Sequence, residues 1–167
     1  MTVSKIMLLG EIGVGKSSIV RRLVFDKFEM QYTPTIGVDV YRYIVPIPEG
    51  GTHNLIVWDT DGNYAEAIFR HVYMRQASAA LVVADIARPE TIVHATKLAE
   101  GFREQMPGRP CVIIMNKADL VTDADTVNLP ASSVNRSLPL LRTSAATGQN
   151  VKHAFEYAAA AIRRRSL

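Results

Sequence analysis

The sequence predicts an α/β fold in which a mostly parallel β-sheet is covered by helices on both faces. Short, nearly continuous apolar runs alternate with longer segments whose apolar residues recur with helical period. Such runs are typical of parallel strands, because helices on both faces of the sheet bury both sides of each strand. No linker or repeat divides the 167 residues, and 48% of them are hydrophobic, so we expect residues 1–167 to form a single domain.

The individual elements follow from the apolar pattern. Four continuous apolar runs have the length of buried strands: 5–9, 55–58, 79–84 and 111–115. Residues 38–47 alternate between apolar and polar side chains, which indicates an edge strand. Three segments carry an apolar face with helical spacing: 15–25, 91–106 and 151–165. Residues 122–139 are rich in Ser, Asn and Asp, which predicts a loop with at most a short helix.

Composition and charge exclude several other classes of function. The net charge is +3 and the sequence pI is about 9.1, but no run of Lys and Arg forms a basic stripe, so we expect no nucleic-acid partner. Cys111 is the single cysteine, which rules out an intrachain disulfide, and the four histidines lack metal-ligand spacing. The first apolar run is broken at Gly10 and Glu11, so neither a signal peptide nor a membrane span is expected. We therefore expect a cytoplasmic protein.

Residues 10–17, GEIGVGKS, match the phosphate-binding pattern G-x-x-x-x-G-K-[ST]. They directly follow a predicted strand and open a predicted helix, which is the context that the pattern requires; an ordinary turn is the alternative interpretation. The glycines let the backbone approach phosphate oxygens, Lys16 reaches the terminal phosphates, and the Ser17 hydroxyl can bind Mg²⁺. The predicted phosphate contacts are Gly13, Val14, Gly15, Lys16, Ser17 and Ser18.

Residues 116–119, NKAD, stand at the end of another predicted strand, where a parallel sheet presents its loops to a ligand. The Asp119 carboxylate can accept hydrogen bonds from the N1–H and 2-amino groups of guanine, a donor pair that adenine lacks. Lys117 can lay its methylene groups on the base, and Asn116 can tie this loop to residues 10–17. Alone, NKAD could be an ordinary turn; after a phosphate loop, it predicts a guanine nucleotide.

With these motifs, and with TIGVD at 35–39 and WDTDG at 58–62, essentially the whole chain resembles the Ras-like small GTPases, and most closely their Rab branch. The resemblance implies a P-loop small GTPase fold, with a mostly parallel six-stranded sheet, one antiparallel edge strand and helices on both faces. It also implies a molecular switch that binds GTP or GDP with Mg²⁺ and acts as a GTP phosphohydrolase.

The resemblance assigns roles to residues that spacing alone does not single out. The hydroxyl of Thr35 would bind Mg²⁺ beside Ser17, and Asp59 would hold the ion through a water. Gly62 would donate its N–H to the γ-phosphate. Around the base, the implied contacts are Phe28, Ser144, Ala145 and Ala146, the last of which replaces the usual lysine.

The sequence departs from the family pattern at Asn63, which replaces the glutamine that orients the attacking water. Asparagine is one methylene shorter, and a misplacement of about 1 Å lowers a rate roughly 10²-fold. The predicted catalytic residues are therefore Asn63, Lys16 and Gly62, with a low intrinsic rate of GTP hydrolysis.

Three positions keep two interpretations each. Phe28 either packs on the guanine or belongs to the core at the end of the first helix, and Thr35 is either a switch residue or part of a turn. Asp61 stands where the family has a small alanine. Its carboxylate either faces the γ-phosphate and weakens GTP binding, or points to solvent or to a nearby cation such as Arg70 or Arg75.

The resemblance also implies partners. An effector, an exchange factor and an activating protein would bind surfaces near Ile36 and Tyr64, which rearrange with the nucleotide. The C-terminal sequence AIRRRSL has no cysteine for prenylation, so we expect no lipid anchor and membrane contact only through a partner. Two other classes compete with the switch: a GTP-binding interaction module with negligible hydrolysis, favoured by Asp61 and Asn63, and a P-loop kinase or ATPase, disfavoured by NKAD.

Overall fold

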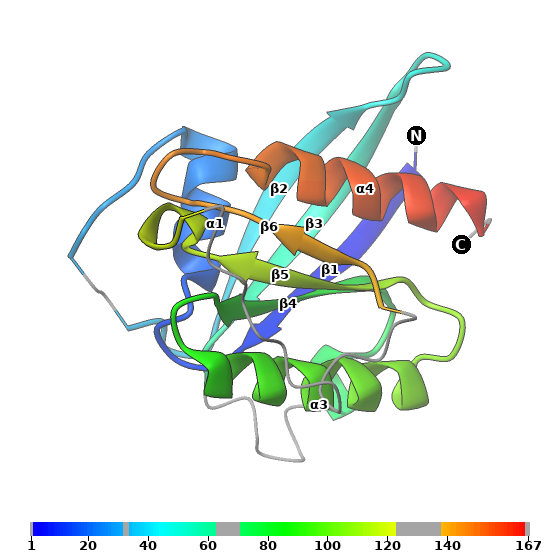
Figure 1. Ribbon diagram of the computed structural model, residues 1–167. Coiled ribbons are helices and arrows are strands. Elements are labelled where there is room, and N and C mark those ends of the chain that lie inside the picture. The colour runs from blue at the N-terminus through cyan, green and yellow to red at the C-terminus, as the bar shows by residue number, and fades with distance from the viewer. Residues whose placement is uncertain (1, 32–33, 63–70, 123–137, 166–167) are drawn as a thin grey trace.

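The computed structural model describes residues 2–31, 34–62, 71–122 and 138–165. In this part of the chain six strands form one sheet in the order β2-β3-β1-β4-β5-β6 (Figure 1). Their bounds are Thr2–Gly10 (β1), Val38–Pro46 (β2), Thr52–Thr60 (β3), Ala77–Asp85 (β4), Cys111–Asn116 (β5) and Leu140–Arg142 (β6). All neighbouring strands pair in parallel except β2, which lies at the edge and runs antiparallel to β3. The prediction of a mostly parallel six-stranded sheet with one antiparallel edge strand is confirmed.

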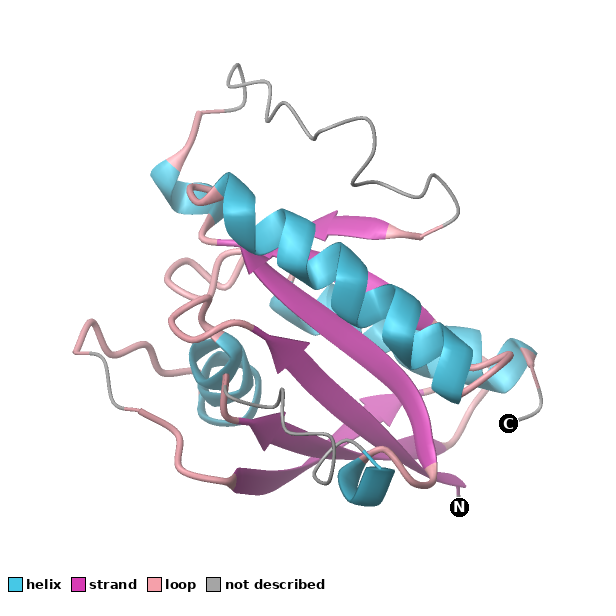
Figure 2. Cartoon of the chain, turned by 90° about the horizontal axis from the view of Figure 1, so that it is seen from below, coloured by secondary structure: helices cyan, strands magenta, loops and turns pink. Residues whose placement is uncertain are grey.

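Helices cover both faces of this sheet, as predicted. They are α1 (Lys16–Phe25), α3 (Pro89–Gln105) and α4 (Val151–Arg164), with a short 3-10 helix, η1, at Ala118–Leu120. Helices α1 and α4 lie on one face and α3 on the other (Figure 1), and Figure 2 shows α3 running alongside the strands. None of the helices in the described residues is both long and apolar enough to cross a membrane.

Strand β1 shows why the buried strands read as continuous apolar runs. Ile6 and Leu8 pack in the core under α1 and α4, whereas Met7 and Leu9 pack in the core under α3. Successive side chains of a strand point to opposite faces, so a strand between two helical layers needs apolar residues at every position. Phe155 of α4 fills the first core, and it is fully buried.

The element boundaries differ from the predicted ones for physical reasons. Strands β1 and β3 begin three residues earlier than predicted, at Thr2 and Thr52, because ladder hydrogen bonds use the backbone and do not require apolar side chains. Helix α3 begins at Pro89, because proline fits the first helical position, where its missing N–H has no partner to lose. Most of the predicted loop at 122–139 lies outside the described residues.

The carboxyl ends of the central strands meet at one edge of the sheet. Strands β2 and β3 lie on one side of β1, and strands β4, β5 and β6 lie on the other. Such a switch point in strand order is where open α/β sheets bind ligands. The register brings Leu8 beside Asp59, and Asp85 beside Asn116. Polar residues from β3, β4 and β5 therefore surround the loop that follows β1.

Truncating the core aromatic of α4 tests this packing. We expect Phe155→Ala to lower the free energy of unfolding by about 3–5 kcal/mol, because it leaves a large cavity under α4. Val3→Ala, at a side chain that is 61% exposed, should change it by less than about 0.5 kcal/mol. Urea unfolding followed by circular dichroism measures both, and equal losses would contradict the assigned core.

Candidate functional site

The loop at residues 10–17 connects β1 to α1 and lies at the edge of the sheet just described. Gly15 precedes the first turn of α1 with φ 98°, a left-handed conformation that disfavours other residues. A Cβ at this position would lie 2.3 Å from Nδ2 of Asn116, so the loop and the end of β5 approach as closely as glycine allows. The helix N-terminus opens toward the cavity described below, which favours an anionic ligand.

Lys16 is held within this loop by the loop's own backbone. Its Nζ donates hydrogen bonds to the carbonyl oxygens of Gly10 and Glu11, both at 2.9 Å. Burial lowers the pKa of Lys16 to about 8, and the carboxylates of Asp59, Asp61 and Glu11 oppose this effect by stabilising the charge. An ammonium group in this position is suited to an anion such as a terminal phosphate.

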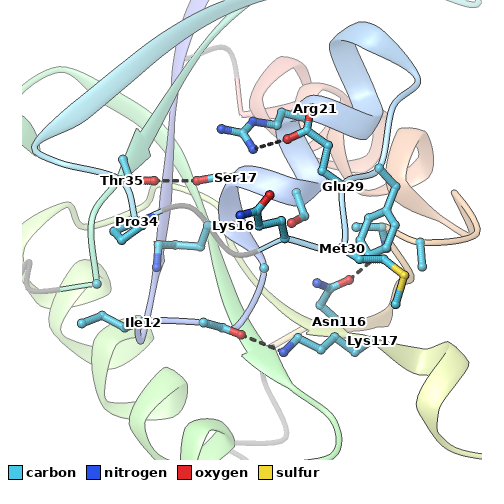
Figure 3. A pocket seen from close by; sticks show the side chains of 18 of the residues that line it. Ile12, Lys16, Ser17, Arg21, Glu29, Met30, Pro34, Thr35, Asn116 and Lys117 are labelled. Atoms are coloured by element: carbon cyan, nitrogen blue, oxygen red, sulfur yellow. Dashed lines mark hydrogen bonds and ion pairs between the residues drawn. The ribbon is translucent and has the colours of Figure 1, made fainter.

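Ser17, Thr35 and Asp59 form one group of oxygen atoms beside Lys16. The hydroxyls of Ser17 and Thr35 lie 2.7 Å apart (Figure 3). Ser17 also donates to Oδ2 of Asp59 at 2.5 Å. Burial raises the pKa of Asp59 to about 6, although the hydrogen bond from Ser17 and the charge of Lys16 act in the opposite direction.

This group fits a hard divalent cation. Its donors are all oxygens, as Mg²⁺ prefers. The other carboxylate oxygen of Asp59, Oδ1, is buried and has no hydrogen-bond partner among the described residues, so a donor atom remains for a ligand. Ser17, Thr35 and Asp59 are therefore the residues that would hold Mg²⁺.

Asn116, at the end of β5, joins three loops through one buried amide. Its Nδ2 donates to the carbonyl of Val14 at 3.0 Å, and its Oδ1 accepts from the Thr143 hydroxyl and from the N–H of Ala145, both at 3.2 Å. The neighbouring Asp119 carboxylate accepts a 2.6 Å hydrogen bond from the Ser144 hydroxyl. The two motifs and the loop after β6 thus form one structure.

A cavity of about 560 Å³ lies between these loops (Figure 3), within the size range of small-molecule sites. The predicted contacts that line it are Gly13, Gly15, Lys16, Ser17, Ser18, Phe28, Thr35, Gly62, Asn116, Lys117, Asp119, Ala145 and Ala146. The predicted contacts Val14, Asp59 and Ser144 are buried and do not line it. Asn63 and Tyr64 lie outside the described residues.

The open alternatives for Phe28 and Asp61 can be compared with this geometry. Phe28 is 41% exposed and lines the cavity, so the interpretation as core is wrong. Asp61 also lines the cavity, where its carboxylate stabilises the charge of Lys16 and its Oδ2 accepts a long, 3.4 Å hydrogen bond from the N–H of Gly37. Asp61 therefore lines the cavity, whereas Arg70, one of the cations considered for it, lies outside the described residues.

Gly62 packs directly on the phosphate loop. A Cβ at Gly62 would lie 2.3 Å from Cγ1 and 2.4 Å from the backbone nitrogen of Ile12. Only glycine allows the two segments to approach this closely. Gly62 and Ile12 are therefore in direct contact.

Sequence reasoning missed Arg22, a residue of α1 that supports the loop after β6. Its Nε donates to the carbonyl of Ala145 at 2.7 Å and its Nη2 to that of Ala146 at 2.5 Å. These partners are 123 and 124 residues away along the chain, so no spacing signal distinguishes Arg22 from other helical arginines. Arg22 therefore holds the backbone of both alanines, which line the cavity.

The fold and the loop at 10–17 together define a P-loop protein, and comparison with known proteins specifies its family. A family model described as Ras family matches residues 5–164. Ras-related protein Rab-22A from Canis lupus familiaris is 33% identical over 154 residues, which cover 90% of this chain and 79% of the relative. The human Rab-22A is 32% identical with the same coverage. The GTP-binding protein ypt5 of Schizosaccharomyces pombe is 33% identical over 155 residues, 90% of this chain and 74% of the relative.

The chain therefore belongs to the Ras family of small GTPases and resembles its Rab members. It is a GTP-binding switch protein of the P-loop class. The family resemblance predicted from the motifs is confirmed.

Removing Arg22 tests whether it supports the site. We expect Arg22→Ala to weaken guanine-nucleotide binding roughly 10-fold, because two carbonyls lose charged donors and the loop at 144–146 loosens. Titration with a fluorescent GDP analogue measures the affinity. Arg164→Ala, at an exposed arginine at the end of α4, is the matched control and should bind normally. Equal affinity of both variants would contradict the role of Arg22.

Proposed function

We propose that this chain binds GTP or GDP with Mg²⁺ in the cavity, hydrolyses GTP slowly to GDP and phosphate, and changes its surface when the γ-phosphate is lost. The observation that carries the proposal is that one cavity of about 560 Å³ is lined both by the phosphate-type loop with Lys16 and by Asp119 of the NKAD motif. A nucleoside triphosphate has the two chemically different ends that this arrangement requires.

The base end of the cavity supports guanine. The Asp119 carboxylate, oriented by the hydroxyl of Ser144, would accept from the N1–H and 2-amino groups of the base. The N–H of Ala145 already donates to Asn116, so Ala145 and Ala146 would contribute chiefly packing on the base side, together with Phe28 and Lys117. Adenine would leave the carboxylate without its two donors.

The residues at the phosphate end of the cavity support catalysis by charge stabilisation and not by covalent chemistry of the protein. Lys16 and the N–H groups of residues 13–18 would bind the β- and γ-phosphates, and the N–H of Gly62 would contact the γ-phosphate. Mg²⁺, held by Ser17, Thr35 and Asp59, would neutralise charge on the same phosphates. In our proposal Asn63 orients the attacking water, and its shorter side chain makes intrinsic hydrolysis slow.

The position of Asp61 supports weaker binding of GTP than in family members that have alanine at this position. Its carboxylate lines the cavity and faces Lys16, so a γ-phosphate would add a second negative charge nearby. This observation also favours the competing function, a GTP-binding interaction module with negligible hydrolysis. Measured turnover separates the two.

The partner surface would include Ile36, which is 93% exposed beside Thr35. We propose that an effector, an exchange factor and an activating protein bind there. The hydroxyl of Thr35 contacts Ser17, which also contacts Asp59, so a ligand bound to these oxygens would set the position of the segment around Thr35. The Tyr64 side of this surface lies outside the described residues. A cytoplasmic location agrees with the single, buried cysteine.

Base selectivity tests the ligand. We expect the protein to bind GTP far more tightly than ATP, and Asp119→Ala to weaken GTP binding roughly 10²-fold or more, since the guanine donors lose their acceptor. Isothermal titration with each nucleotide measures this. Glu104→Ala, which removes an exposed carboxylate at the end of α3, should not change GTP affinity. Equal affinity for ATP and GTP, or an unaffected Asp119→Ala, would overturn the guanine assignment.

Single-turnover hydrolysis tests the catalytic part. We expect the GTP-loaded wild type to be slow at 25 °C in Mg²⁺, Asn63→Gln to be faster by up to roughly 10²-fold, and Asn63→Ala to be slower than wild type. Release of phosphate from preloaded protein gives the rate. A fast wild type, or equal rates in all three proteins, would show that Asn63 does not position the water. No turnover even in Asn63→Gln would favour the interaction module.

A further inference from the structure

The carboxylate of Asp85, at the end of β4, holds two cations in a nearly dry position. The residue is only 3% exposed. Its Oδ1 accepts a hydrogen bond from the N–H of Ala87 at 2.9 Å, and its Oδ2 faces Nζ of Lys117 at 2.7 Å and Nε of Arg88 at 3.2 Å. Both oxygens are therefore satisfied, and the two cations are fixed relative to each other.

Both cations also donate to the phosphate loop, at consecutive carbonyl groups. Lys117 donates to the carbonyl of Gly13 at 2.7 Å (Figure 3), and Nη2 of Arg88 donates to the carbonyl of Ile12 at 3.1 Å. The guanidinium thus uses two different nitrogens, one for Asp85 and one for Ile12. A single buried carboxylate connects, through two side chains, to two adjacent peptide groups of the loop.

Fixing these carbonyls also fixes the N–H groups on the other side of the same peptides. In a trans peptide the C=O of one residue and the N–H of the next point in opposite directions. Holding the carbonyls of Ile12 and Gly13 therefore sets the direction of the N–H groups of Gly13 and Val14. Such N–H groups are the donors with which a loop of this kind binds phosphate oxygens.

Neither the local backbone nor the protein's stability explains this placement of the Arg88 side chain. Arg88 precedes the first turn of α3, but its side chain makes no capping hydrogen bond to that helix. The side chain is 40% exposed, and ion pairs of this exposure contribute little to stability. Arg88 also does not belong to any of the recognised motifs.

We propose that Arg88 is a positioning residue which, anchored on Asp85, holds Ile12 and Gly13 in the conformation that binds phosphate and thereby slows release of guanine nucleotide. The inference rests on the proposed nucleotide-binding function of the cavity. It extends the site to a side chain that does not line the cavity. Because Ile12 also packs against Gly62, the same contact steadies the segment that precedes Asn63.

The test measures release of a fluorescent GDP analogue from preloaded, full-length protein after addition of excess unlabelled GDP. We expect Arg88→Ala to release it roughly 3- to 10-fold faster, which is the range of one charged, partly exposed hydrogen bond. Arg88→Lys should release it at a rate between those of wild type and Arg88→Ala, because an ammonium group can donate to two acceptors, as Lys117 does, but lacks the fixed spacing of the guanidinium nitrogens. Arg103→Ala, at an exposed arginine in the last turn of the same helix, is the matched control and should release at the wild-type rate.

Two further measurements separate positioning from a general loss of structure. Thermal unfolding of the Arg88 variants should stay close to that of wild type, and Arg88→Ala should add little to the release rate of Asp85→Asn, because both changes break the same connection. Unchanged release in Arg88→Ala, or additive effects of Arg88→Ala and Asp85→Asn, would overturn the inference. If the wild type fails to bind guanine nucleotide at all, it is the proposed function that fails.

Discussion

The buried amide of Asn116 is the interaction on which the site depends. It donates to the phosphate loop through Val14, and it accepts from both Thr143 and Ala145 at the beginning of the last loop. Each of these partners is itself buried, so without the amide several polar groups would stay unsatisfied in an apolar setting. Because Gly15 has no side chain, the amide can come close enough to make these hydrogen bonds.

The strands of the central sheet could be predicted from the sequence because burial on both faces requires apolar residues at nearly every position. The edge strand β2 was recognisable from its alternation, since Tyr41, Tyr43 and Val45 pack against one core while the residues between them are exposed. The last strand, Leu140–Arg142, could not be located: it has three residues, and its pairing with β5 is a long-range contact that leaves no local pattern. The predicted ends of helices and strands differ from the observed ends wherever backbone pairing or a proline, and not the apolar pattern, determines the end.

For the site, the residues that belong to contiguous motifs were predictable, and those that act across the fold were not. The pattern at 10–17 and NKAD specify their own geometry, because adjacent residues share one loop. Arg22, Asp85 and Arg88 reach their partners only after the sheet has formed, so their roles appear in the structure alone. The role of Asn63 stays a prediction from the sequence.

The two hydrogen bonds that anchor Lys16 bear on the thermodynamics of ligand capture. A lysine side chain that is free in solution loses about 1.5–2 kcal/mol of conformational entropy when it is ordered. Here the carbonyls of Gly10 and Glu11 already restrict the chain, so that loss belongs to folding and does not recur when an anion arrives. Lys16 consequently offers its charge from a nearly rigid support, much as a helix N-terminus does.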